Sequence, residues 1–67
     1  MESKGYAYQV QYESRFGGDK IDYVVANNEA EVRAMFADKI IDYVAESAYK
    51  VDFNASKSEI MYAINRD

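Results

Sequence analysis

Four carboxylates in the middle of the chain have the spacing of one helix face. They are Glu31, Asp38, Asp42 and Glu46, and the last three follow one another at intervals of four residues. On a helix such a step advances about 6 Å, close to the spacing of successive phosphates along a nucleic-acid strand. The spacing therefore suggests an acidic surface that imitates nucleic acid and binds a basic protein. The commoner interpretation is a water-facing helix side, although Lys39 is the only base on this arc.

Aromatic residues form a second candidate site for a partner. Phe16 lies next to Arg15 in a stretch that contains two glycines, and aromatic residues and Arg dominate binding hot spots. Phe16 could equally fold back over the sheet. Among the seven tyrosines, Tyr43 and Tyr49 lie near the ends of expected elements and are candidates for an interface. The other tyrosines mostly fit the edge of a core, with their hydroxyls in water.

The sequence lacks the residues that most catalytic mechanisms need. There is no Cys and no His, which removes thiolate nucleophiles, nucleophilic triads and the commonest metal ligands. The acidic pairs Asp19/Asp22 and Asp38/Asp42 are better explained as solvated charges, because the chain is too short to build a cleft around them. We therefore expect a protein that is not an enzyme and that needs no cofactor or metal.

The expected helix positions the carboxylates. It runs from Asn28 to Ala48, with Asn28 as its cap and Glu31 closing a capping box. Apolar residues recur with the period of a core-facing helix. They are Val32, Phe36, Ile40, Tyr43 and Val44. The prediction is one long amphipathic helix.

Alternation between apolar and polar residues predicts strands on both sides of this helix. From Tyr6 to Glu13 every second residue is apolar, residues 15–19 can turn, and Lys20–Ala26 alternates again, which predicts a hairpin. Its expected buried face carries Tyr8, Val10, Tyr12, Ile21, Tyr23 and Val25, and its other face is expected to be solvated. Residues 49–55 alternate once more and predict a third strand.

The last residues fit two interpretations. Ser56 and Glu59 can form a capping box for a short helix, whereas Ile60, Tyr62 and Ile64 alternate as in a fourth strand, which we favour. The expected fold is a two-layer α+β domain spanning residues 1–67, with the helix on one face of an antiparallel sheet and residues 1–5 frayed. Its order is ββαββ, or ββαβα in the alternative.

Size and charge restrict the possible partners. The 67 residues carry twelve acidic and eight basic side chains, so the net charge is −4, which favours basic partners over nucleic acid. The function expected is a protein-binding module, of the inhibitor type, on a basic surface of a larger protein. Nucleic-acid binding through the sheet and a structural homodimer are the alternatives. No apolar run is long enough for a membrane span, and an intracellular, soluble protein is expected.

Overall fold

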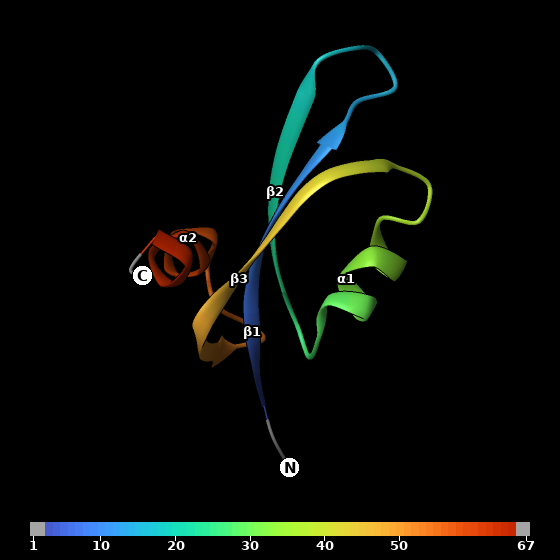
Figure 1. Cartoon of the computed structure of the whole chain (residues 1–67). Coiled ribbons are helices and arrows are strands. Elements are labelled where there is room, and N and C mark those ends of the chain that lie inside the picture. The colour runs from blue at the N-terminus through green and yellow to red at the C-terminus, as the bar shows by residue number, and fades with distance from the viewer. Residues whose placement is uncertain (1–2, 66–67) are drawn as a thin grey trace.

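The structure, a computed structural model, describes residues 3–65 and has the order ββαβα. The elements are β1 (Lys4–Glu13), β2 (Asp19–Ala26), α1 (Glu29–Met35), β3 (Ile40–Asp52) and α2 (Lys57–Asn65). The strands form one antiparallel sheet in the order β2-β1-β3, and the two helices lie on opposite sides of it (Figure 1). The α+β class is confirmed, but the single helix layer is not. Of the lead-in expected to fray, Lys4 and Gly5 begin β1, while residues 1–2 lie outside the described part.

Strand β1 is the centre of the sheet and is buried on both faces. Tyr8, Val10 and Tyr12 point toward α1 and contact Val32 and Phe36 in the larger core cluster. On the other face, Ala7 belongs to a second cluster. That cluster contains Ile60 and Ala63 of α2, with Tyr23, Val25, Val51, Ala55 and Ile64 packed around them. The face expected to be solvated is therefore covered by α2 over this part of the sheet.

The turn between β1 and β2 sets the register of the hairpin. Gly17 and Gly18 have φ angles of 91° and 80°, which residues with a side chain rarely adopt. The resulting register places Tyr8 opposite Val24. The side of β2 that faces α1 thus carries Val24 and Ala26, whereas Ile21, Tyr23 and Val25 were expected there. The length of the turn sets the register, and the register decides which alternate residues of β2 share a face with Tyr8 and Val10 of β1.

The long helix is the main prediction that the structure contradicts. Helix α1 begins as expected, with the Asn28 side chain accepting a hydrogen bond from the Glu31 N–H at 2.9 Å. It ends at Met35, its seventh residue, and Phe36 takes a non-helical conformation with φ −112° and ψ 32°. The chain turns through residues 36–39 and enters β3 at Ile40. Of the 21 residues of the expected helix, residues 40–48 are therefore strand and only residues 29–35 are helix.

A bulge explains why a strand has the apolar spacing of a helix. The register of β3 against β1 shifts between the pairs Gln11↔Tyr43 and Tyr12↔Ile41. The extra residue brings Ile41 and Val44, three positions apart, against the same α1-side core. A spacing of three, typical of a helix, arises here because one inserted residue interrupts the alternation of the strand. Of the third strand expected over residues 49–55, residues 49–52 form the end of this longer strand, whereas residues 53–55 follow it as a turn.

A second irregularity in β3 is stabilised by a buried serine. The β1–β3 register shifts again between Tyr6 and Tyr8, opposite Ser47. There the Ala7 N–H donates to Ser47 Oγ at 3.0 Å, and this hydroxyl donates to the Tyr49 carbonyl at 2.6 Å. Ala7 is fully buried on β1, and the Ser47 hydroxyl gives its N–H the acceptor that the β3 backbone does not supply.

The end of the described chain is a helix, so the favoured fourth strand is wrong and the alternative ββαβα order is confirmed. Ser56 caps α2 by accepting from the Glu59 N–H at 3.3 Å. Ile60 and Ala63 lie one turn apart and are the buried residues of α2. Their burial against the second sheet face supplies the tertiary contact that a two-turn terminal helix needs. The last two residues of the expected element, 66–67, lie outside the described part.

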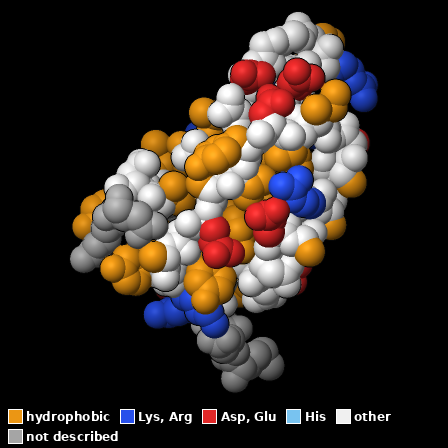
Figure 2. All heavy atoms as spheres, viewed as in Figure 1, with side chains coloured by type: hydrophobic (Ala, Val, Ile, Leu, Met, Phe, Trp, Pro, Cys, Tyr) orange, Lys and Arg blue, Asp and Glu red, His pale blue; other side chains and the backbone are white. Residues whose placement is uncertain are grey.

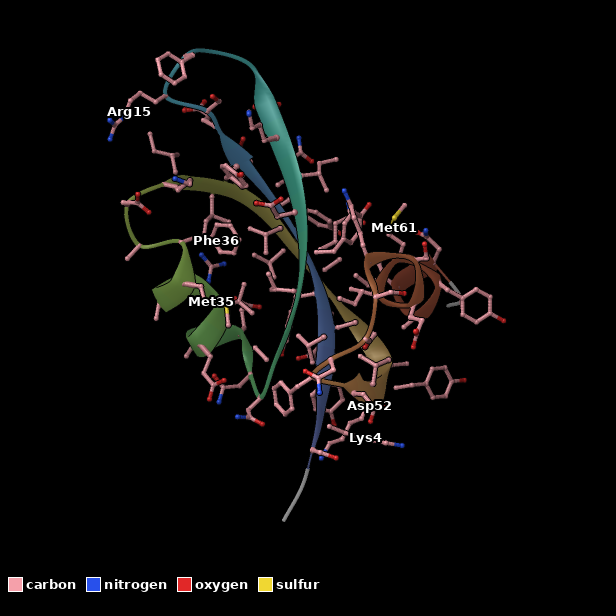
Figure 3. The ribbon with its side chains drawn as sticks, turned by 180° about the vertical axis from the view of Figure 1, so that it is seen from behind. Lys4, Arg15, Met35, Phe36, Asp52 and Met61 are labelled. Carbon is pink, nitrogen blue, oxygen red and sulfur yellow. The ribbon has the colours of Figure 1, made fainter. Side chains whose placement is uncertain are left out.

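Two neighbouring residues test where α1 ends. Phe36 is 8% exposed and points at the sheet (Figure 3), and its ring contacts the Tyr12 ring at a tilt of 42° with 5.3 Å between the ring centroids, whereas Met35 is 54% exposed. We expect Phe36→Ala to lower the free energy of unfolding by about 3 kcal/mol and Met35→Ala to change it by less than about 0.5 kcal/mol. Urea denaturation measures both. Equal losses at the two positions would contradict this packing.

The buried serine gives a second stability prediction. Ser47→Ala leaves the Ala7 N–H without an acceptor inside the protein, so we expect a loss of about 1–3 kcal/mol in the free energy of unfolding. The exposed Ser58 is the matched control, and Ser58→Ala should stay close to wild type. Chemical denaturation compares the two variants, and an unchanged Ser47→Ala protein would remove Ser47 from this role.

Candidate functional site

An open groove lies between the hairpin tip and the turn that leads into β3, and we call it the tip groove. Its volume is about 580 Å³. It is lined by Tyr12, Glu13, Ser14, Arg15, Phe16, Lys20, Asp38, Lys39 and Ile40. Two apolar side chains at this groove are strongly exposed, Phe16 at 93% and Ile40 at 65%. The expected alternative, in which Phe16 covers the core, is therefore wrong.

The two walls of the tip groove are held by different contacts. In the hairpin wall the Ser14 N–H donates to the Gly18 carbonyl at 2.9 Å, and the Phe16 N–H donates to Ser14 Oγ at 3.3 Å. In the opposite wall the Lys39 N–H donates to the Phe36 carbonyl at 3.0 Å, and Lys39 Nζ lies 5.8 Å from the centre of the Tyr12 ring. The backbone bonds order both walls while leaving the apolar side chains free to contact a ligand.

Tyr12 forms the floor between these walls. Its hydroxyl donates to Asp22 Oδ2 at 2.8 Å, and this hydrogen bond, followed by burial, raises the pKa of Tyr12 above its usual value. The neutral phenol is therefore favoured, and its proton is already engaged. This geometry suits a rigid contact surface rather than proton transfer.

Three of the predicted site residues meet at the tip groove. They are Arg15, Phe16 and Asp38, which are 22 or more positions apart across the two walls. Arg15 extends outward from the hairpin tip (Figure 3). Sequence reasoning did not assign Ile40, Lys20 or Tyr12 to this site, because Ile40 was expected inside the core and the other two inside the sheet. Only the placement of β3 brings Ile40 to the hairpin tip.

The predicted acidic stripe does not exist as one helix face. Glu31 lies on α1, Asp38 in the following turn, and Asp42 and Glu46 on β3. Acidic side chains on the face seen in Figure 2 lie in separate groups rather than in a row. The phosphate-like spacing argued from a helix is thus lost, because strand residues four apart are separated by about 13 Å.

Most of these carboxylates also have partners inside the protein. Glu31 accepts from the Asn27 N–H at 3.1 Å, one residue before the expected capping-box donor, and this bond lowers its pKa. Asp38 lies 3.4 Å from Lys39 Nζ. Glu46 accepts from the Tyr8 hydroxyl. These contacts assign structural roles to carboxylates that sequence reasoning had assigned to a partner.

The two tyrosines of the predicted interface lie apart from the tip groove and from each other. Tyr43 is 56% exposed and pairs with Gln11 on the α2 side of the sheet. Tyr49 lines a second groove of about 420 Å³ between β3 and α2, together with Val51, Tyr62 and Ala63. The predicted residues therefore do not form one site.

Within residues 3–65, no three acidic side chains come together in a group that could hold a metal ion. No helix in the same part of the chain is long and apolar enough to cross a membrane.

The bond between Tyr8 and Glu46 makes stability depend on pH. Burial first, and then this hydrogen bond, raises the pKa of Tyr8 well above its ordinary value of 10.0. The folded state holds the proton more tightly than the unfolded state, so this stabilisation is complete below pH 10 and is lost as the pH rises above it.

We expect Tyr8→Phe to lose about 0.5–1.5 kcal/mol at neutral pH and to show a shallower decline of the free energy of unfolding above pH 10 than wild type. Tyr43→Phe, at an exposed position, should follow wild type. Urea denaturation at a series of alkaline pH values measures both. Parallel curves for Tyr8→Phe and wild type would contradict the assigned role.

Comparisons with protein-family models, with curated protein sequences and with solved structures gave no significant match to this chain. A function for the tip groove therefore depends on the residues and geometry of this chain alone.

Proposed function

We propose that the protein is a non-enzymatic protein-binding module that binds a larger protein at the tip groove. The observation that carries the proposal is the pair of strongly exposed apolar side chains, Phe16 at 93% and Ile40 at 65%, on one open groove. Exposure of a Phe and an Ile costs hydration free energy in the free protein, and burial against a partner recovers it.

The surroundings of these two residues resemble a binding interface. Apolar anchors at the centre and a charged rim are the usual arrangement, and Arg15 beside Phe16 is a residue type enriched at hot spots. The rim contains the bases Arg15, Lys20 and Lys39 and the acids Glu13 and Asp38, so it can form ion pairs of both signs.

The acidic excess of the chain lies outside the tip groove. The groove carries three bases and two acids, whereas the whole chain has a net charge of −4. A partner that presents an apolar protrusion to the groove and carries a basic surface beyond its rim fits this distribution. Long-range attraction would speed the encounter, and the apolar contacts would hold the complex. If the partner needs the covered surface for its own activity, binding would regulate or inhibit that activity.

The test is affinity capture from cells that express the protein, followed by a binding titration with the captured partner. We expect Phe16→Ala and Ile40→Ala each to weaken binding about tenfold or more, as truncation of an apolar hot spot does. Tyr43→Ala is the matched control, since it removes an aromatic side chain of 56% exposure outside the groove and should leave binding unchanged. Binding that survives both groove variants would overturn the proposal.

A gel-shift titration separates this proposal from nucleic-acid binding. The three bases near Phe16 and Tyr12 are the residues that a single strand would contact. We expect no shift of single-stranded or duplex oligonucleotides at low salt. A shift that is lost in an Arg15→Ala, Lys39→Ala variant would favour nucleic acid as the ligand and contradict a protein partner.

A further inference from the structure

The two outer edges of the sheet differ in regularity. In the described part of the chain no strand pairs with the far side of β2 or of β3. Strand β3 is irregular at two places, and such bulges prevent a further strand from pairing. Strand β2 pairs with β1 without any register shift. Its first half, Asp19–Asp22, is exposed throughout, so β2 offers the edge on which a strand can be added.

The alternation of hydrogen bonds identifies the free backbone groups of β2. The Ser14 N–H donates to the Gly18 carbonyl, so hydrogen-bonded pairs recur at every second position along the hairpin. Lys20 and Asp22 then bond to β1, while the N–H and C=O groups of Asp19, Ile21 and Tyr23 point away from the sheet. Ile21 lies at the centre of this outward set and is 45% exposed.

The charges of β2 fit a second copy of the same strand. If two copies run antiparallel with Ile21 opposite Ile21, Lys20 of each copy lies opposite Asp22 of the other, on the α1 side of the sheet. On the α2 side, Asp19 comes opposite Tyr23, whose ring lies 5.7 Å from Lys57 Nζ. Registers whose two-fold axis lies one residue away, at residue 20 or at residue 22, place Lys20 opposite Lys20 or Asp22 opposite Asp22. The charges thus favour one register over its neighbours.

We propose that two copies of this chain form a symmetric dimer through the outer edge of β2, with Ile21 on the two-fold axis and Lys20 paired with Asp22 of the second copy. The dimer joins the two sheets into one continuous antiparallel sheet. Roughly six backbone hydrogen bonds close the edge. The added burial offsets the small core of a short chain. This inference does not depend on the proposed function. Lys20 borders both surfaces, but the dimer is formed by the backbone edge of β2, whereas the proposed function depends on the exposed Phe16 and Ile40.

Sedimentation equilibrium of the full chain at several concentrations tests the dimer. We expect wild type to reach the dimer mass as concentration rises. Ile21→Pro removes an N–H that points away from β1, so the fold should survive while pairing is lost, and this variant should stay monomeric. Ile21→Thr keeps the N–H and should still dimerise. A monomeric wild type, or an Ile21→Pro protein that dimerises as wild type does, would overturn the proposal.

Charge reversal tests the register. Lys20→Asp alone and Asp22→Lys alone each place like charges opposite one another twice, so we expect the dissociation constant to rise about tenfold or more. An equimolar mixture of the two variants restores both pairs and should dimerise as wild type does. Far-UV circular dichroism confirms that each variant is folded. A mixture no tighter than the separate variants would contradict this register.

Discussion

The double-sided burial of β1 is the constraint on which the rest of the structure depends. Its backbone is paired on both edges, by β2 and by β3, and its side chains face α1 on one side and α2 on the other. A chain of this length can build only small cores, and one central strand serves two of them. Each helix is too short to be stable alone and is held by the face it covers (Figure 1). Because the two helices cover the two faces of the sheet, its outer edges and the tip groove stay exposed.

Local sequence signals predicted those features of the fold that do not depend on tertiary contacts. The alternation of β1, the glycine turn and the Asn28 cap have their expected places in the structure, and the Ser56 capping box occurs as in the alternative that was not favoured. The helix over residues 28–48 was wrong because a bulged strand and a helix share the spacing of Ile41 and Val44. Four β-branched residues lie in β3, and this composition favours the strand once β1 offers an unpaired edge. Because α1 covers only one face of the sheet, the other apolar face is available to α2, and this accounts for the second helix layer.

The candidate site was predictable in its residue types but not in its location. Phe16 and Arg15 could be recognised from a glycine-containing turn, and the structure does expose them. Ile40 could not, because its role depends on β3 and not on the expected helix stripe. Glu31 and Glu46 were predicted to bind a partner, but each already accepts a hydrogen bond within the protein. The donor to Glu31 is Asn27, four residues earlier, and the donor to Glu46 is Tyr8 on the neighbouring strand. Residue type indicated what could bind, and topology decided which residues remained free to do so.

The strand identity of residues 40–52 is the central claim, and nuclear Overhauser contacts between backbone protons test it most directly. Val10 lies opposite Val44 in the β1–β3 register, at a position where the two residues are not hydrogen-bonded to each other. The Hα protons of such a pair approach closely, so we expect a strong Hα–Hα contact between Val10 and Val44. Strong sequential amide contacts from Ile40 to Ala48 without any cross-strand contact would show a helix there and contradict the structure described.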